Sequence, residues 1–225
     1  MVSHLMCVAH KVTVLLLLIL PSYAAQAVID ISPKVLEISK DRAEVYITNT
    51  GDKPEFVDIT LFELSNPGVA PDEEQRIPLG LVREPYLYAS PFKLSLGPRQ
   101  EKTIHLKALK TPEKEKVYRL AVIPQQQARI NGTQNNLMLV NLGYLGLVRQ
   151  LPEKKVVSWQ HHCETQGITL TSTGTVRVVF SELQQDSQTA EDFNVYPGTP
   201  RRVVAQRLSG KANNTPFSLQ CGAGS

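Results

Sequence analysis

Apolar and polar residues alternate along most of this chain with a period of two, which is the spacing of a strand that buries one face. In segment 42–50, for example, Val45 and Ile47 are expected to face a core while the residues between them face water. The same alternation predicts further strands, which are separated by turns rich in Gly, Pro, Asn and Asp: 28–38, 56–64, 92–96, 102–109, 116–123, 156–160, 168–172, 176–183, 203–208 and 217–221. Pro33 interrupts the first of these strands, which implies an edge or a bulge there. No segment shows the period of an amphipathic helix three turns long. Short strands at this spacing indicate an all-β protein of the sandwich type.

One segment, 136–149, departs from the pattern because it is apolar on both faces. Its sequence is NLMLVNLGYLGLVR, and a strand would place Met138, Val140, Leu142 and Tyr144 together on one face. The other face would also be mainly apolar, whereas a half-exposed strand has one polar face. Two interpretations remain. Either the strand is buried in a sandwich core, or it is an edge strand whose second face receives a partner.

The strand pattern is interrupted twice. Residues 66–84 are rich in Pro, Gly and charge and are expected to form a loop, and residues 151–155 (LPEKK) are expected to separate two domains. A Thr-Gly turn between alternating strands occurs in both halves, at 50–51 and 173–174. We therefore expect two immunoglobulin-like β-sandwich domains, residues 28–151 and 152–225. They are not of the antibody type, because the single tryptophan precedes Cys163 instead of lying between two cysteines.

The first 27 residues have the features of a cleaved secretory signal. Lys11 precedes an apolar run at 12–20, and Ala25-Gln26-Ala27 provides the small residues of a cleavage site. The run is too short to span a bilayer comfortably. We expect a mature chain that begins near Val28, with cleavage after Ala24 or a retained anchor as the alternatives.

Charge and cysteine usage fit an exported protein. The chain has 24 basic and 21 acidic residues, so that loss of Lys11 leaves a net charge of about +2, too little for a nucleic-acid binder on bulk charge. With Cys7 in the signal, Cys163 and Cys221 remain, and in an oxidising compartment the simplest expectation is one disulfide. The adjacent pair 161–162 of histidines lacks the spacing of a zinc site.

Catalytic motifs are missing from the sequence. It contains no Gly-x-Ser-x-Gly, no phosphate-binding glycine loop and no His-Glu-x-x-His. We therefore expect neither an enzyme nor a bound metal or cofactor.

Several segments, in order, resemble a known family. They are LSNPG at 64–68, PFKLSLGPRQEKTIHL at 91–106, VYRLAV at 117–122, LVNLGYLGLVRQLP at 139–152, STGTVRV at 172–178 and NVYPG at 194–198. Together with the signal, this set resembles the periplasmic pilus chaperones of bacterial chaperone–usher pathways, especially the branch that serves colonisation-factor (class 5) fimbriae. The resemblance covers nearly the whole mature chain.

The resemblance implies a fold, a location and a mechanism. Two immunoglobulin-like domains would form a boomerang in the periplasm, and segment 136–149 would be the last strand of the first domain, called G1. Such chaperones bind pilus subunits one to one, and lend G1 to the groove left by the subunit's missing strand, a known form of strand addition. They then deliver the subunit to an outer-membrane usher. The face assigned to the groove is Met138, Val140, Leu142 and Tyr144; in the alternative assignment this face fills the chaperone's own core.

The family also holds the subunit's terminal carboxylate with two basic residues in the cleft between the domains. Lys34 falls where the first-strand cation would be, and Arg149 lies two residues beyond Leu147, which occupies the position of the usual G1 lysine. The resemblance thus implies Lys34 and Arg149 as anchors. In an alternative interpretation Arg149 forms an interdomain salt bridge. Arg119 is a third basic candidate, with a structural role favoured.

Two further expectations concern function and association. A secreted two-domain adhesin or pilus structural subunit is the alternative to the chaperone, although a pilus protein of that kind would be an incomplete single sandwich with a free N-terminal extension. An exposed strand with two apolar faces also favours self-association, so a self-capping dimer of the free protein is one expected state. Nucleic-acid binding and membrane insertion are not expected.

Overall fold

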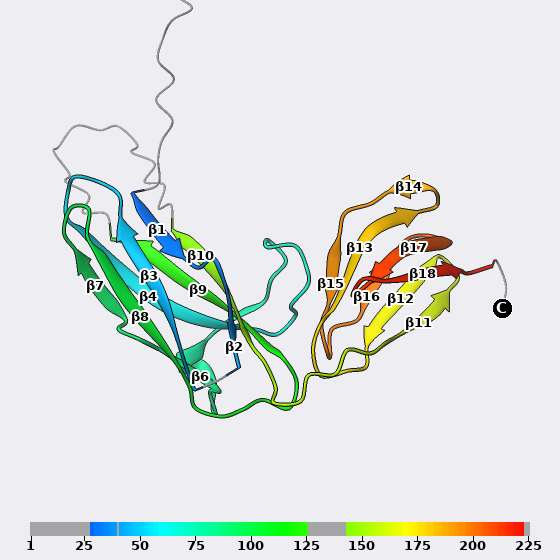
Figure 1. Ribbon diagram of the computed structural model, residues 1–225, viewed down its shortest axis with the longest axis horizontal. Coiled ribbons are helices and arrows are strands. Elements are labelled where there is room, and N and C mark those ends of the chain that lie inside the picture. The colour runs from blue at the N-terminus through cyan, green and yellow to red at the C-terminus, as the bar shows by residue number, and fades with distance from the viewer. Residues whose placement is uncertain (1–27, 40, 126–142, 223–225) are drawn as a thin grey trace, which may run out of the picture.

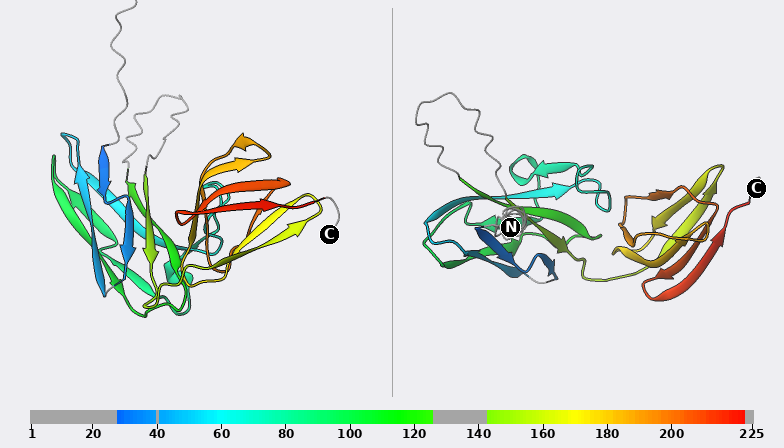
Figure 2. Two further views of the ribbon diagram at one scale, coloured as in Figure 1. Left: turned by 45° about the vertical axis from the view of Figure 1, so that its right-hand side comes forward. Right: turned by 90° about the horizontal axis from the view of Figure 1, so that it is seen from above.

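The computed structural model describes residues 28–39, 41–125 and 143–222. Within these ranges the chain forms two β-sandwiches that meet at an angle, as in a boomerang (Figure 1). The chain passes from one sandwich to the other through segment 151–158 (Figure 2). The only helical element in this part of the chain is one 3-10 turn, η1 (Leu79–Leu81). The predicted all-β class with two sandwich domains is therefore confirmed.

No helix among the described residues is long and apolar enough to cross a membrane.

The first sandwich packs one sheet of order β1-β3-β8-β6 against a second of order β2-β10-β9-β4-β5, in which β7 also pairs with β4. The strands are β1 (Ile29–Ser32), β2 (Val35–Ile38), β3 (Arg42–Asn49), β4 (Glu55–Leu64), β5 (Arg76–Pro78), β6 (Leu87–Ser90), β7 (Lys93–Leu96), β8 (Glu101–Ala108), β9 (Lys116–Pro124) and β10 (Tyr144–Gln150). Their inward side chains form one apolar core. Val45 and Ile47, assigned inward from the alternation, are at most 1% exposed in it.

The first extended segment changes sheets at Pro33. Before it, β1 pairs antiparallel with β3, and after it, β2 pairs parallel with β10. The Ser32–Pro33 peptide bond is cis, and a proline is compatible with such a break because it has no N–H to give to a ladder. The predicted interruption at this residue is confirmed, and it joins the two sheets at one side of the sandwich.

The expectation of a loop at 66–84 was wrong for its second half. Residues 76–78 form β5, which pairs with β4, and η1 follows directly. Charge and proline obscured a strand of only three residues, whose place at a sheet edge tolerates both. Residues between β4 and β5 do form a loop, which extends toward the second sandwich (Figure 1).

The second sandwich has a smaller core. One sheet has the order β11-β12-β16 and the other β14-β13-β17-β18, with β15 paired to β13. The strands are β11 (Trp159–Glu164), β12 (Gly167–Ser172), β13 (Val178–Gln185), β14 (Gln188–Thr189), β15 (Phe193–Val195), β16 (Arg201–Val203), β17 (Arg207–Ala212) and β18 (Thr215–Gln220). Phe180 is fully buried at the centre, where Trp159 packs on it edge to face with ring centroids 5.2 Å apart.

The strand predicted at 156–160 is displaced toward the C-terminus. β11 begins only at Trp159, and Val156 and Val157 are exposed. The backbone of Val156 is engaged differently, because its carbonyl accepts the N–H of Thr175 at 2.9 Å. These two valines thus belong to a loop, where the backbone of Val156 binds Thr175. Local β-propensity does not indicate this arrangement.

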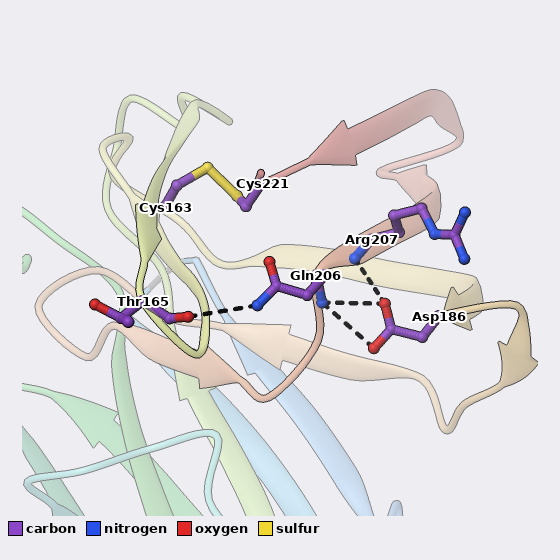
Figure 3. Close-up of a disulfide and its surroundings, with 6 residues drawn as sticks. All are labelled: Cys163, Thr165, Asp186, Gln206, Arg207 and Cys221. Carbon is purple, nitrogen blue, oxygen red and sulfur yellow. Dashed lines mark hydrogen bonds between the residues drawn. A yellow bond between two sulfur atoms is a disulfide. The ribbon is translucent and has the colours of Figure 1, made fainter. Parts of the chain in front are cut away.

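Cys163 and Cys221 form the expected disulfide, with Cα atoms 5.5 Å apart. The bond ties β11 to the end of β18, at one side of the second sandwich (Figure 3). Beside it, the N–H of Cys221 donates to the carbonyl of Gln206 at 2.9 Å, and the Asp186 carboxylate accepts the N–H groups of Gln206 and Arg207. The outer end of the domain is therefore held by both covalent and hydrogen bonds.

Candidate functional site

β10 is an edge strand over part of its length. It pairs with β9 along Tyr144–Gln150, but on its other side β2 joins it only from Leu147 onward. Among the described strands, none pairs with Tyr144, Leu145 or Gly146 on that side. Backbone groups along such an edge are able to pair with a strand from another chain.

The two faces of β10 have different surroundings. Val148 is buried in the first core and Tyr144 packs against that core from its margin. Leu145, on the opposite face, is 44% exposed, and Leu147 packs with Val117 and Tyr196 in a small apolar cluster that includes residues of both domains. The face of β10 that carries Leu145 and Leu147 therefore points into the region between the two sandwiches.

The residues assigned to the subunit groove lie in two parts of the chain. Met138, Val140 and Leu142 are outside the described residues. Tyr144 is half-buried, and the Lys34 ammonium lies 5.9 Å from the centre of its ring. In a strand that continued β10 without a bulge, the first three would share the side of Tyr144 and Val148.

Arg149 is buried in an ion-pair cluster. Its side chain is 7% exposed, its Nε donates to Glu115 at 2.5 Å, and its Nη1 contacts the carboxylate of Glu37. Burial alone would lower the pKa of Arg149, but the hydrogen bond and charge of Glu115, with the charge of Glu37, raise it above its ordinary value. The guanidinium is therefore charged and already holds two carboxylates.

Those two carboxylates differ in their surroundings. The Glu115 side chain is fully buried, its second oxygen accepts the backbone N–H of Arg177 at 2.8 Å, and its own N–H donates to the carbonyl of Thr175 at 2.8 Å. Glu37 is the residue of β2 directly across from Arg149, and its side chain is 52% exposed. Both of these ion pairs of Arg149 therefore lie within the first domain, and of the two carboxylates only Glu115 continues the contact into the second domain, through the N–H of Arg177.

Lys34 lies between β1 and β2 and is exposed. Its carbonyl accepts the N–H of Leu147 at 2.9 Å, which fixes this backbone beside β10 at the place where the open edge ends. The Lys34 ammonium lies by the ring of Tyr144, five residues before Arg149 along β10, so the structure does not bring these two side chains together.

Arg119 is ion-paired with a carboxylate of its own domain. It lies directly across β9–β10 from Leu147 and binds the carboxylate of Glu74 through Nε at 3.0 Å and Nη2 at 2.5 Å. Arg76 binds the same carboxylate, whose side chain is only 3% exposed. Burial alone would raise the pKa of Glu74, but hydrogen bonds from Arg119 and Arg76 outweigh it and lower that pKa.

The loop before Glu74 makes a second link between the domains. Arg201 on β16 donates from Nη1 to the carbonyl of Gly68 at 2.7 Å, and its guanidinium stacks 4.3 Å from the ring of Phe193. Gly68 has a φ of 97°, and a Cβ there would lie 2.9 Å from the carbonyl oxygen of Asn194. A glycine therefore allows the loop to approach β15 closely. A polar cleft of about 380 Å³ between the domains is lined by Arg119, Leu147 and Arg201 among others.

Sequence reasoning missed the acidic residues of this region. Glu37 alternates with apolar residues in a strand, and Glu74 and Glu115 follow other charged residues in stretches typical of solvated loops. Nothing in the local pattern distinguishes them from surface carboxylates. Only their position against Arg149 and Arg119 shows that they are partners of buried cations.

The comparisons with known proteins agree on one architecture. No family model matches the chain. A CFA/I fimbrial subunit of Escherichia coli, designated A, is 28% identical over 158 residues, which are 66% of this chain and 64% of that relative's length. The chain thus spans less than two thirds of this curated relative.

Solved structures match over most of both chains. The class 5 fimbriae chaperone CfaA has a TM-score of 0.66 at 19% identity, over 86% of this chain and 99% of that chain. A chain from a chaperone–tip adhesin complex of CFA/I fimbriae biogenesis has a TM-score of 0.67 at 20% identity, over 87% and 99%. A chain from the CsuC–CsuE chaperone–tip adhesin complex of Acinetobacter baumannii Csu pili has a TM-score of 0.57 at 15% identity, over 87% and 98%. The chain therefore has the two-domain fold of fimbrial chaperones, which include class 5 members.

Proposed function

We propose that this protein is a periplasmic chaperone that binds pilus subunits by donor-strand complementation and passes them to an outer-membrane usher. The observation that carries the proposal is the open edge of β10, which lacks a strand partner before Leu147 among the described strands. The chain before this edge is the segment 136–143, apolar on both sides. A strand that continued β10 would offer both an unpaired backbone and apolar side chains to an incomplete sandwich.

The donated side chains are Met138, Val140 and Leu142, with Tyr144 at the margin. In a strand that continued β10 without a bulge, they would share, by parity, the side that faces the first core. A subunit whose groove receives this strand, at the end of the first sandwich, would then continue the apolar core of that sandwich. Burial of three such side chains contributes on the order of 5–8 kcal/mol before ordering costs.

The end of the site that lies in the cleft between the domains would hold the subunit's terminal carboxylate. Lys34 and Arg149 are the proposed anchors: the Lys34 backbone binds Leu147 where the open edge ends, and Arg149 follows two residues later on β10. Charged hydrogen bonds to a carboxylate are about twice as strong as neutral ones, so that they would fix the register of the donated strand. Among proteins of this fold, chaperone–subunit complexes are known for CFA/I fimbriae, Csu pili and the SafA pilin.

The test is co-expression with the secreted β-rich protein encoded beside this chain in a bacterial periplasm, followed by affinity purification. Three forms are compared: the parent, Val140→Asp with Leu142→Asp, and the opposite-parity control Leu139→Asp with Asn141→Asp. We expect a 1:1 complex with the parent, its loss in the first double variant, and its retention in the control. Far-UV circular dichroism and denaturant unfolding verify that each form is folded.

Other outcomes have definite meanings. Loss of the complex only in the control assigns the groove to the opposite face. Retention in both folded double variants contradicts strand donation through this segment. If the parent captures no pilus protein and instead assembles into fibres itself, the alternative of a structural subunit or adhesin is favoured.

A further inference from the structure

Arg149 is held by one fixed and one replaceable carboxylate. Glu115 is fully buried and is engaged at both oxygens, by Arg149 Nε and by the N–H of Arg177. Glu37 contacts Arg149 only at Nη1, and half of its side chain remains in water. Rotating Glu37 outward would therefore cost little desolvation, whereas removing Glu115 would leave a buried charge and a buried N–H without partners.

We propose that Glu37 occupies, in the free protein, the position on Arg149 that the subunit's terminal carboxylate takes in the complex. The incoming carboxylate replaces Glu37 at Nη1 of the guanidinium. The proposal rests on the proposed chaperone function. It assigns Arg149 a double role: its Nε keeps the bond to Glu115, which in turn binds the N–H of Arg177 in the second domain, and its Nη1 changes partner.

The exchange follows from the charge balance of the site. Without Glu37, the free protein would hold a nearly buried guanidinium with one side unpaired. With Glu37 in place, that side is paired and Arg149 is held in position by its direct neighbour across β2–β10. A terminal carboxylate presents the same two oxygens as Glu37, so that the site exchanges one carboxylate for another.

Competition by Glu37 has a direct consequence for affinity. Because half of the Glu37 side chain is in water, its competition is expected to be modest, and Glu37→Gln should strengthen carboxylate binding by about two- to fivefold. The variant keeps Glu115 and hence the charge partner of Arg149. Glu84→Gln is the matched control, because Glu84 is an exposed glutamate ion-paired with Lys110, away from β10.

The experiment titrates N-acetyldiglycine, and separately its C-terminal amide, into the full chain with ¹⁵N-labelled arginines. The signal is the Nε–Hε resonance of Arg149, identified by its loss in Arg149→Lys. We expect the carboxylate to shift this resonance, the amide to leave it unchanged, and the half-saturation concentration to fall about two- to fivefold in Glu37→Gln but not in Glu84→Gln.

The exchange is refuted if the carboxylate leaves the Arg149 resonance unmoved in Glu37→Gln, if the amide shifts it equally, or if both variants bind alike. The probe contains no pilus protein, so the result is independent of strand donation. Carboxylate exchange without capture of a pilus protein would contradict the proposed function alone. Capture without exchange would contradict only the role of Glu37.

Discussion

Glu115, directly before β9, accepts the backbone N–H of Arg177 in the second domain at 2.8 Å. The same carboxylate binds Arg149 at 2.5 Å, and its own N–H donates to the carbonyl of Thr175. One buried side chain therefore joins the last strand of the first sandwich to the second sandwich. The contact between the domains thus includes a carboxylate that is fully buried.

Removal of this charge should loosen the domain pair. Glu115→Gln is expected to destabilise the protein by about 2–4 kcal/mol, because one partner of a buried ion pair is lost while the other stays buried. Urea unfolding followed by circular dichroism measures the loss, and small-angle X-ray scattering reports the change in angle. Glu113→Gln, an exposed glutamate two residues away, should change neither. Equal unfolding curves for the two variants would contradict the bridging role.

The interdomain loop should not tolerate a side chain at residue 68. Gly68→Ala places a Cβ 2.9 Å from the carbonyl oxygen of Asn194 at a φ of 97°, and is expected to cost about 1–3 kcal/mol. Limited proteolysis should then cut the loop more rapidly. Gly80→Ala is the matched control, because no atom lies within 4 Å of its added Cβ. Similar proteolysis of both variants would mean that the loop does not depend on this close approach.

The Cys163–Cys221 disulfide should stabilise the second domain selectively. It closes a separation of 58 residues, for which the chain-entropy model gives about 4 kcal/mol. The single tryptophan, Trp159, lies in this domain, so its fluorescence follows the unfolding of that domain. Replacing both cysteines by serine should shift the fluorescence transition strongly. Amide exchange in β3 and β8 of the first core should be unaffected, and a parallel loss there would show that the domains unfold as one unit.

Glu74 should give the protein an acid-sensitive contact. Its pKa is lowered in the folded state, against a burial effect of opposite sign, by the hydrogen bonds of Arg119 and Arg76. A lowered pKa contributes stability above the unfolded-state value, near 4.5, and this contribution is lost as the pH falls through the lower folded-state value. Glu74→Gln should therefore reduce stability at pH 7 and flatten its decline below about pH 4.5.

The measurement is the free energy of unfolding in urea as a function of pH. Glu73→Gln, an exposed neighbour, serves as the control and should reproduce the acid decline of the parent. A parent-like decline in Glu74→Gln would contradict the assignment.

The strand composition of the chain follows from local sequence alone. Alternation at Val45 and Ile47 identified which face of β3 is buried, because the two-residue period is local and the hydrophobic effect acts on each residue. Proline at 33 similarly marked the break between β1 and β2. Two cysteines outside the expected signal were enough to predict the disulfide.

The partners of the charges and the course of weakly patterned segments depend on the folded arrangement. Val156 and Val157 have the propensity of a strand but remain outside β11, since the backbone of Val156 binds the turn at Thr175. The sequence leaves Arg149 as either an anchor or an interdomain residue, and its partners Glu115 and Glu37 are found only in the folded chain. A charge acquires its role from groups within a few ångströms of it in space. Those groups come from positions 34 to 112 residues away along the chain, and no local pattern records them.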